Sequence, residues 1–212
     1  MIEFALIIPV WLPLLLGTLW TGSTMIRGLQ VTQAARDAAS MFCRGVDFST
    51  GTGTDSDNIL DKVTQDIGTL SGTGNGVMIF STITYVGNNV CTAAGAAYHN
   101  SATPPQHTAA CTNYGKFVFT QRYTVGHDGL RSSNFGSPTL ADRDATKQYT
   151  IPISKYVTNI NDVATFNLLP VPAENATDGY QSGQPIYVVE AYFSGPGQAG
   201  YTQGGSYAFA IF

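Results

Sequence analysis

Charged residues are scarce in this sequence. They make up 11% of its 212 residues, about half of the share that is usual in soluble domains. The 10 Lys and Arg residues are scattered singly and the formal net charge is −4, so the chain lacks the basic patch that binds a phosphate backbone. These absences exclude nucleic acid as a partner.

The sequence also lacks the patterns that catalysis and metal binding need. His99 and His107 have no carboxylate or thiol at a spacing that completes a metal site. His127 precedes Asp128, but no nucleophile motif accompanies them. The glycine clusters are not followed by the Lys and helix of a phosphate-binding loop. We therefore predict no catalytic residues, no metal site and no cofactor, and hence no enzyme.

Cysteine is equally sparse, with 3 residues in the chain. Cys91 and Cys111 bracket one polar loop, and we predict that they form a disulfide. Closing this loop of about twenty residues stabilises the fold by roughly 3 kcal/mol, and it places the protein in an oxidising compartment outside the cytoplasm. Cys43 remains at the end of a predicted helix beside Phe42, where we expect buried packing rather than a reactive thiol.

The longest uncharged run lies at the start of the chain, from Phe4 to Ile26, directly after Glu3. No basic residue precedes it and no Ala-x-Ala follows Leu16, so it is not a cleavable signal peptide. As a helix it would be about 34 Å long, enough to cross a bilayer core of about 30 Å, and a membrane-spanning stage is physically allowed. Because a lone carboxylate is expensive to bury unless it is neutralised, we expect Glu3 to mark a helix end that docks on other subunits.

The helical pattern continues beyond this run. Residues 21–43 have the period of an amphipathic helix, which predicts one helix of about forty residues and about 60 Å. Its first half is apolar on all sides and needs lipid or other copies around it, whereas its second half needs cover on one face, from the chain's own head. Pro9 and Pro13 lie inside the first half. They either kink the helix in the ordinary way or melt it locally so that packed helices slide, and both alternatives stay open.

The composition changes near residue 45, where a linker of Ser, Thr, Gly and Asp leads to a predicted short helix ending near Gly68. Pro152 lies in one of the later period-two runs and restricts that run to a sheet edge or bulge. The fold class is therefore α+β, with a long N-terminal hydrophobic helix (1–44) and a C-terminal antiparallel β-rich globular head (45–212). The last strand completes the head's sheet or, alternatively, adds to a neighbour's sheet. The five predicted strands are rich in aromatic and β-branched residues and span 77–86, 116–125, 149–154, 186–194 and 206–212.

Sugar attachment has only weak signals in the sequence. Asn175, Ala176 and Thr177 form an N-glycosylation sequon. We therefore name Asn175 as a possible glycosylation site.

The N-terminal segment resembles the TadE-like proteins, which are pilin-related subunits of bacterial tight-adherence systems. The resemblance covers about the first 44 residues and rests on an E-F-A-L-I-I-P core that leads into a long helix with a QAARDAA run. Beyond residue 45 only the architecture, a β-rich head, is similar. The residues expected to act in assembly are Glu3, Phe4, Leu6, Pro9, Trp11 and Pro13.

The resemblance implies a precursor that a prepilin-type peptidase cuts after a glycine. It also implies that the mature helix is held in the inner membrane before the assembly machinery extracts it. In the family the glutamate is usually the fifth mature residue, whereas here it is the third, so either the cleavage site differs or two residues precede this sequence. Glu3 is expected to meet the amino terminus of a neighbouring subunit, since an ammonium is the simplest partner for a buried carboxylate.

Three functions remain open at this point. The chain is a homopolymeric structural subunit of an extracellular, adhesive pilus-like filament (a fimbrium) on the cell surface, or a minor pseudopilin retained in the membrane. The third alternative is a single-pass membrane protein whose β-domain binds a ligand. We favour the filament, because a low-charge head rich in hydroxyl groups and glycine suits an exposed, repeating surface.

Overall fold

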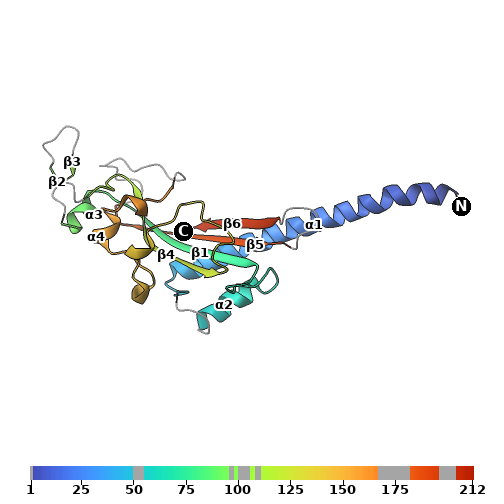
Figure 1. Cartoon of the computed structure of the whole chain (residues 1–212), viewed down its shortest axis with the longest axis horizontal. Helices are drawn as coiled ribbons and strands as arrows, with labels where there is room; N and C mark the ends of the chain where they lie inside the picture. The colour runs from blue at the N-terminus through green and yellow to red at the C-terminus, as the bar shows by residue number, and fades with distance from the viewer. Residues whose placement is uncertain are drawn as a thin grey trace.

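A computed structural model of the chain describes residues 2–49, 55–95, 98–99, 106–107, 111–166, 182–195 and 204–212. Side chains are described in 8–49, 59–95, 111–166, 182–195 and 204–212. One long helix projects far beyond a head that contains an antiparallel sheet (Figure 1). The α+β fold class expected from the sequence is confirmed.

Helix α1 (Ile2–Cys43) is a single helix of 42 residues, which corresponds to about 63 Å. Pro9 and Pro13 lie inside it, and the helix is not interrupted at either proline. The predicted long helix is therefore confirmed for the single chain. The two alternatives for the prolines, an ordinary kink and local melting in the assembled state, both remain predictions.

The head is built on a four-stranded antiparallel sheet in the order β4-β1-β5-β6. Its strands are β1 (Gly76–Tyr85), β4 (Phe117–Gly126), β5 (Pro185–Ser194) and β6 (Gly205–Ile211). All ten residues of the central strand β1 are buried, because α1 covers one face of the sheet and the segment 127–166 covers the other. Four of the five predicted strands are thus confirmed to within one or two residues.

The predicted strand at 149–154 is wrong. Gln148 and Tyr149 both have a φ of 55°, so the chain turns sharply at the start of this run. Within the run, only Thr150 forms a β-bridge with the outer edge of β4. Pro152, which has no N–H to donate to a ladder, directly precedes helix α4 (Ile153–Tyr156). The run covers the edge of β4 without becoming a strand of the sheet.

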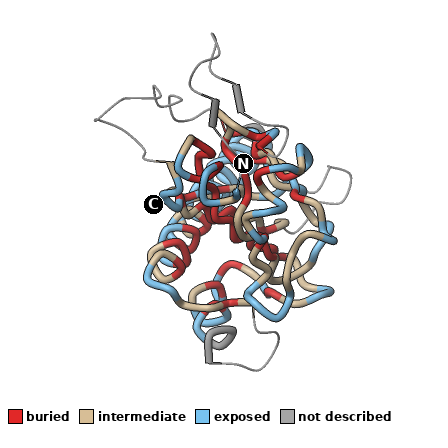
Figure 2. The backbone as a smooth tube through the Cα atoms, turned by 90° about the vertical axis from the view of Figure 1, so that its left-hand side faces the viewer, coloured by how far each residue is buried: buried red, intermediate tan, exposed pale blue. Residues whose placement is uncertain are grey.

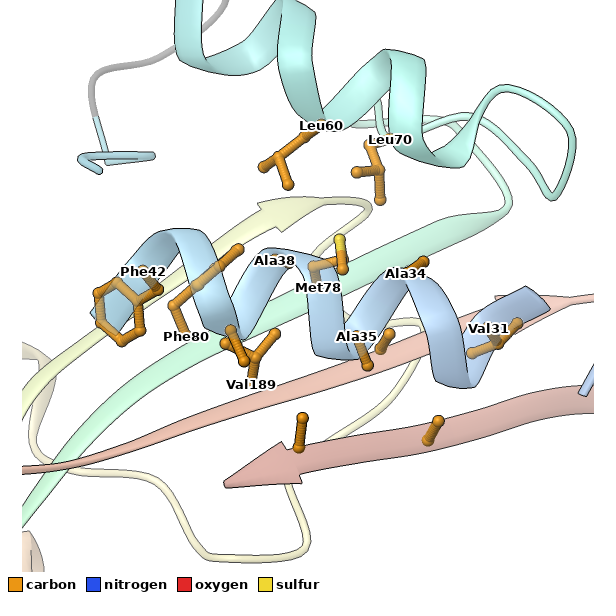
Figure 3. Close-up of a cluster of buried hydrophobic side chains, with 14 of the residues drawn as sticks. Val31, Ala34, Ala35, Ala38, Phe42, Leu60, Leu70, Met78, Phe80 and Val189 are labelled. Atoms are coloured by element: carbon orange, nitrogen blue, oxygen red, sulfur yellow. The ribbon is translucent and has the colours of Figure 1, made fainter. Parts of the chain in front are cut away.

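One face of α1 is part of the head's hydrophobic core (Figure 3). The small side chains Ala34, Ala35 and Ala38 allow the helix to lie close to β5 and β6, and all three are buried. At the end of this face the Phe42 ring meets the rings of Phe80, Tyr123 and Tyr187 edge-on, with centroids 5.2 to 5.9 Å apart. The buried residues of α1, which we call the base, are Val31, Ala34, Ala35, Ala38, Ala39 and Phe42.

Helix α2 (Asp55–Thr64) lies on the other side of the base. Leu60 is fully buried there, and Leu70 closes the same layer from the following loop (Figure 3). The short helix is confirmed, although it ends four residues before Gly68, and Ile67 is buried from the turn behind it. Ile59, the residue before Leu60, is exposed.

The end of the head that lies away from the start of α1 carries several short elements (Figure 1). Cys91 and Cys111 are bonded, are both buried, and have Cα atoms 5.7 Å apart, so the predicted pairing is confirmed. The expected polar loop contains structure that the sequence did not indicate. Its elements are α3 (Asn88–Ala93), β2 (Tyr98–His99) and β3 (Gln106–His107), and three 3-10 turns lie further along the chain at η1 (Leu140–Asp142), η2 (Ala145–Lys147) and η3 (Ile160–Asp162).

Candidate functional site

The most unusual surface of the molecule is the part of α1 from Ile8 to Leu29, which we call the stem. Its large apolar side chains are between 47 and 75% exposed. In the head, by contrast, buried apolar residues form clusters, and the buried parts of the backbone, red in Figure 2, lie inside it. A helix segment of this length measures about 33 Å. The exposed residues are Ile8, Val10, Trp11, Leu12, Leu14, Leu15, Leu16, Leu19, Trp20, Met25, Ile26 and Leu29.

Exposure on the stem is not limited to one side of the helix. A Cβ built on Gly17, Gly22 or Gly28 meets no atom within 4 Å, although Gly22 lies about 140° around α1 from the side that Gly17 and Gly28 share. Monomeric soluble proteins rarely expose a contiguous apolar surface of this extent. Such a surface marks a site where other molecules cover it.

The hydroxyl groups on the stem are already hydrogen-bonded within the helix. Thr18 Oγ1 donates to Leu15 O at 2.9 Å, and Ser23 Oγ donates to Trp20 O at the same distance. Thr21 and Thr24 do likewise with carbonyls three or four residues earlier. Because these donors have acceptors inside α1, the stem can be buried in an apolar environment without leaving a hydroxyl proton unpaired.

The expected assembly residues fall on this part of the chain. Pro9, Trp11 and Pro13 are exposed on the stem, with Trp11 at 69%. Glu3, Phe4 and Leu6 belong to the helical backbone of α1, but their side chains lie outside the described residues. The geometry therefore brings the described members of this set together on one free helix.

The stem ends where the base begins. Val31 is fully buried, and the outward face of α1 changes there from Met25 and Leu29 to the polar, exposed Gln33 and Arg36. The outer face of α1 is thus polar along the base, where the head covers the inner face, and apolar along the stem. Over the part of the chain that is described, no helix meets the combined requirements of length and apolarity for crossing a membrane.

Inside the head, a buried carboxylate holds the segment that covers the sheet. Glu190 on β5 is 1% exposed; its Oε1 accepts hydrogen bonds from Asn134 N at 2.9 Å and Tyr207 OH at 2.7 Å, and its Oε2 accepts from Ser133 Oγ. Burial, and then the bond to Glu190, raises the pKa of Tyr207. These bonds attach the 127–135 loop to β5 and β6.

Arg122 on β4 is the second buried charge on this face of the sheet. Its Nη1 donates to Ser81 Oγ at 2.8 Å. Burial lowers the pKa of Arg122 to about 10, and the nearby Glu190 acts against this shift. The two charges are fully enclosed by the head's own chain, so we interpret them as structural groups. The sequence analysis missed both, although a Glu in the middle of the apolar run IYVVEAYFS was an available signal.

Of the three histidines, His127 is the one whose side chain is described. Its Nδ1 lies 2.9 Å from Gly74 O, and its backbone N donates to Gly76 O at 3.0 Å. His99 and His107 are in the short paired strands β2 and β3, but they are not directly opposite each other. Within the part of the chain that was searched, no three His, Cys, Asp or Glu side chains gather as a metal site would require.

The remaining predicted positions have simple outcomes. Cys43 is half-buried, and its Sγ donates to Ser40 O at 3.2 Å, so it is packed less deeply than the sequence suggested. Asn175, the possible glycosylation site, lies outside the described residues. Cys43 lies beyond the stem, at the end of α1.

Comparison with known proteins supports a relation over the stem and most of the base. A family model described as TadE-like protein matches residues 1–40, which confirms the resemblance over that segment and leaves the head outside it. No curated protein matches the chain, and no solved structure does. The similarity therefore coincides with the exposed apolar helix.

Proposed function

We propose that this chain is the repeating structural subunit of an extracellular, pilus-like filament. In this filament the stems pack against the stems of other copies and form the core, while the heads form the outer surface. The observation that carries the proposal is a stem of about 33 Å whose large apolar side chains are at least 47% exposed.

Two features of the stem favour helix-to-helix packing. Its hydroxyl protons are used inside α1, so burial leaves few polar groups to satisfy. Gly17, Gly22 and Gly28 have open space around them, although glycine inside a helix costs about 1 kcal/mol relative to alanine. The single chain gains nothing from these glycines, whereas packed helices approach closely at small residues.

The base gives the stem a rigid attachment. Because Val31 and Phe42 are buried in the head's core, the stem cannot swing as a separate arm without disrupting that core. A fixed angle between helix and head is what a regular helical polymer requires, since each copy must repeat the same contacts. The surface of the head, which carries few charges, then forms the outside of the filament.

The finer steps follow the TadE-like resemblance of residues 1–40. We propose that a prepilin-type peptidase trims a precursor at the inner membrane and that pilus-assembly machinery adds the subunit to the filament. Adhesion by the heads belongs to the same proposal. Glu3, Phe4, Leu6, Pro9, Trp11 and Pro13 are the residues proposed to line the assembly contacts.

The proposal is tested by shearing surface material from cells that express the chain and imaging it by electron microscopy with an antibody against the head. Regular fibres decorated along their whole length are expected. Decoration only at fibre ends, with most of the chain left in the membrane fraction, would instead establish a minor pseudopilin. A chain that is monomeric in detergent and absent from fibres would contradict both functions.

A further inference from the structure

Two opposite charges flank the uncharged part of α1. Glu3 and Arg27 are the only charged residues among the first 35 positions of the chain. The helix is continuous between them, so their separation of 24 positions (3 to 27) corresponds to about 36 Å. Within one chain the two groups are too far apart to neutralise each other.

Arg27 lies where the stem meets the head. It is half-buried and lies about one helical turn before Val31, the first residue of the base. A Cβ built on Gly195 comes within 3.1 Å of Arg27 Nη1, which places the guanidinium beside the end of β5. Among the described residues both ion pairs involve other side chains, so Arg27 has no counterion in that part of its own chain.

Packing of the stems changes the electrostatic cost of both charges. An exposed charge is solvated by water, but the same charge beside a packed apolar helix is desolvated and needs an opposite charge. Arg36 and Asp37, the next charged residues, are both exposed on α1 and keep their contact with water. Arg27 and Glu3 are therefore the two charges that assembly leaves without solvent.

We propose that Arg27 of one subunit binds Glu3 of another copy, and that this pair sets an axial offset of about 36 Å between parallel stems. This inference rests on the proposed filament. A guanidinium binds a carboxylate through two parallel hydrogen bonds, which fixes geometry better than an ammonium does. The pair neutralises both charged side chains of the first 35 residues, and it gives Glu3 a partner other than the amino terminus that the sequence suggested.

The test exchanges the two charges in the full-length protein and measures filament yield in sheared material. The variants are Glu3→Arg, Arg27→Glu and both together, with Arg36→Glu as the matched control on the exposed face of the same helix. Each single exchange is expected to lower the yield by about tenfold or more, the double exchange to restore it, and the control to leave it unchanged. A Cys91–Cys111 disulfide that still forms in each variant shows that the head has folded.

The outcomes separate this inference from the function on which it rests. Wild-type fibres together with full yield from Arg27→Glu, or a double exchange no better than the single ones, would overturn the pair and leave the filament in place. An absence of wild-type fibres would overturn both.

A crosslinking experiment tests the same contact by distance. Glu3→Cys and Arg27→Cys are combined in a Cys43→Ser background, and intact filaments are oxidised. Because the two positions of one chain are about 36 Å apart, a ladder of covalent multimers is expected only if position 3 meets position 27 of another copy. Glu3→Cys with Arg36→Cys and Arg27→Ala, which also removes both charges of the proposed pair, serves as the control, and its filaments should give no ladder. Filaments that give no ladder from the first pair would contradict the contact.

Discussion

The two parts of α1 differ in what surrounds them, although they form one continuous helix. In the base, buried alanines face the sheet while Gln33 and Arg36 face water, so one partner surface satisfies the helix. In the stem, apolar side chains such as Trp11 and Leu19 are exposed, and no polar face opposes them. The head therefore covers the apolar face of the base, whereas only other molecules can cover the apolar side chains of the stem.

Because the head covers the base and leaves the stem exposed, similar aromatic residues have different roles in the two parts. Phe42 stabilises the head through its contacts with three rings, while Trp11 contributes little to the stability of the single chain because it is 69% exposed. A substitution in the base should therefore change folding, and one in the stem should change assembly. The following variants test that division.

The largest effect is expected from a charge in the middle of the stem. Leu15→Asp should abolish filaments, because a carboxylate would be buried among apolar helices without a partner. Leu15 is 52% exposed in the single chain, so the thermal unfolding midpoint of the monomer in mild detergent should stay within about 1 °C of wild type. Fibre counts by electron microscopy and circular dichroism check the two parts. Normal fibres from this variant would contradict the assignment of the stem.

The next effect concerns the base. Phe42→Ala should lower the free energy of unfolding by about 3–5 kcal/mol, because it removes a buried ring and leaves a cavity. Leu19→Ala on the stem is the matched control and should change this free energy by less than about 0.5 kcal/mol. Urea denaturation of the full-length monomer in mild detergent measures both. Equal losses from the two variants would erase the distinction between base and stem.

The disulfide at the distal end of the head is expected to have a smaller effect. Cys91→Ser should lower the free energy of unfolding by roughly 3 kcal/mol, since it releases a loop of about twenty residues in the unfolded chain. Adding reductant to wild type should have the same consequence, and adding it to the variant should have none. Both are measured by urea denaturation. The base stays intact in either case, so the helix content of the folded protein should not change.

The smallest effect is expected at the stem glycines. Gly17→Ala should stabilise the monomeric helix by up to about 1 kcal/mol, because the added Cβ meets open space. In filaments it should lower the denaturant concentration at which subunits dissociate, since close helix approach is lost. Ser23→Ala, whose hydroxyl bonds only within the helix, is the control. If filaments of Gly17→Ala dissociate at a higher denaturant concentration than wild type, the face of the stem that carries Gly17 does not contact neighbouring helices.

The sequence predicted those parts of the fold that depend on local pattern. An uncharged run from Phe4 to Ile26 indicates a helix without a polar face, and period-two runs indicate strands. The spacing of Cys91 and Cys111 on one loop made their pairing predictable. The sequence also predicted the stem, because a helix that lacks charged residues on every side has no polar face to expose to water.

Other features depend on contacts that local pattern does not encode. Thr150 and Ile151 fit a strand, but the positive φ of Gln148 and Tyr149 turns the chain before them. Glu190 interrupts an apolar strand, and its partner Asn134 lies 56 residues away in the sequence, so no short window could identify the bond. The position where the base begins is likewise set by how far the sheet extends along α1.

The central claim is that the stem is covered when the protein assembles, and the chain provides a direct probe of it. The protein has 2 Trp residues, Trp11 and Trp20, and both are on the stem, so intrinsic tryptophan fluorescence reports on that segment alone. The measurement is acrylamide quenching of purified filaments, compared with the same chain unfolded in urea. The account predicts that both tryptophans resist quenching in filaments. Quenching as strong as in urea would show that the stem remains in water and would contradict the account.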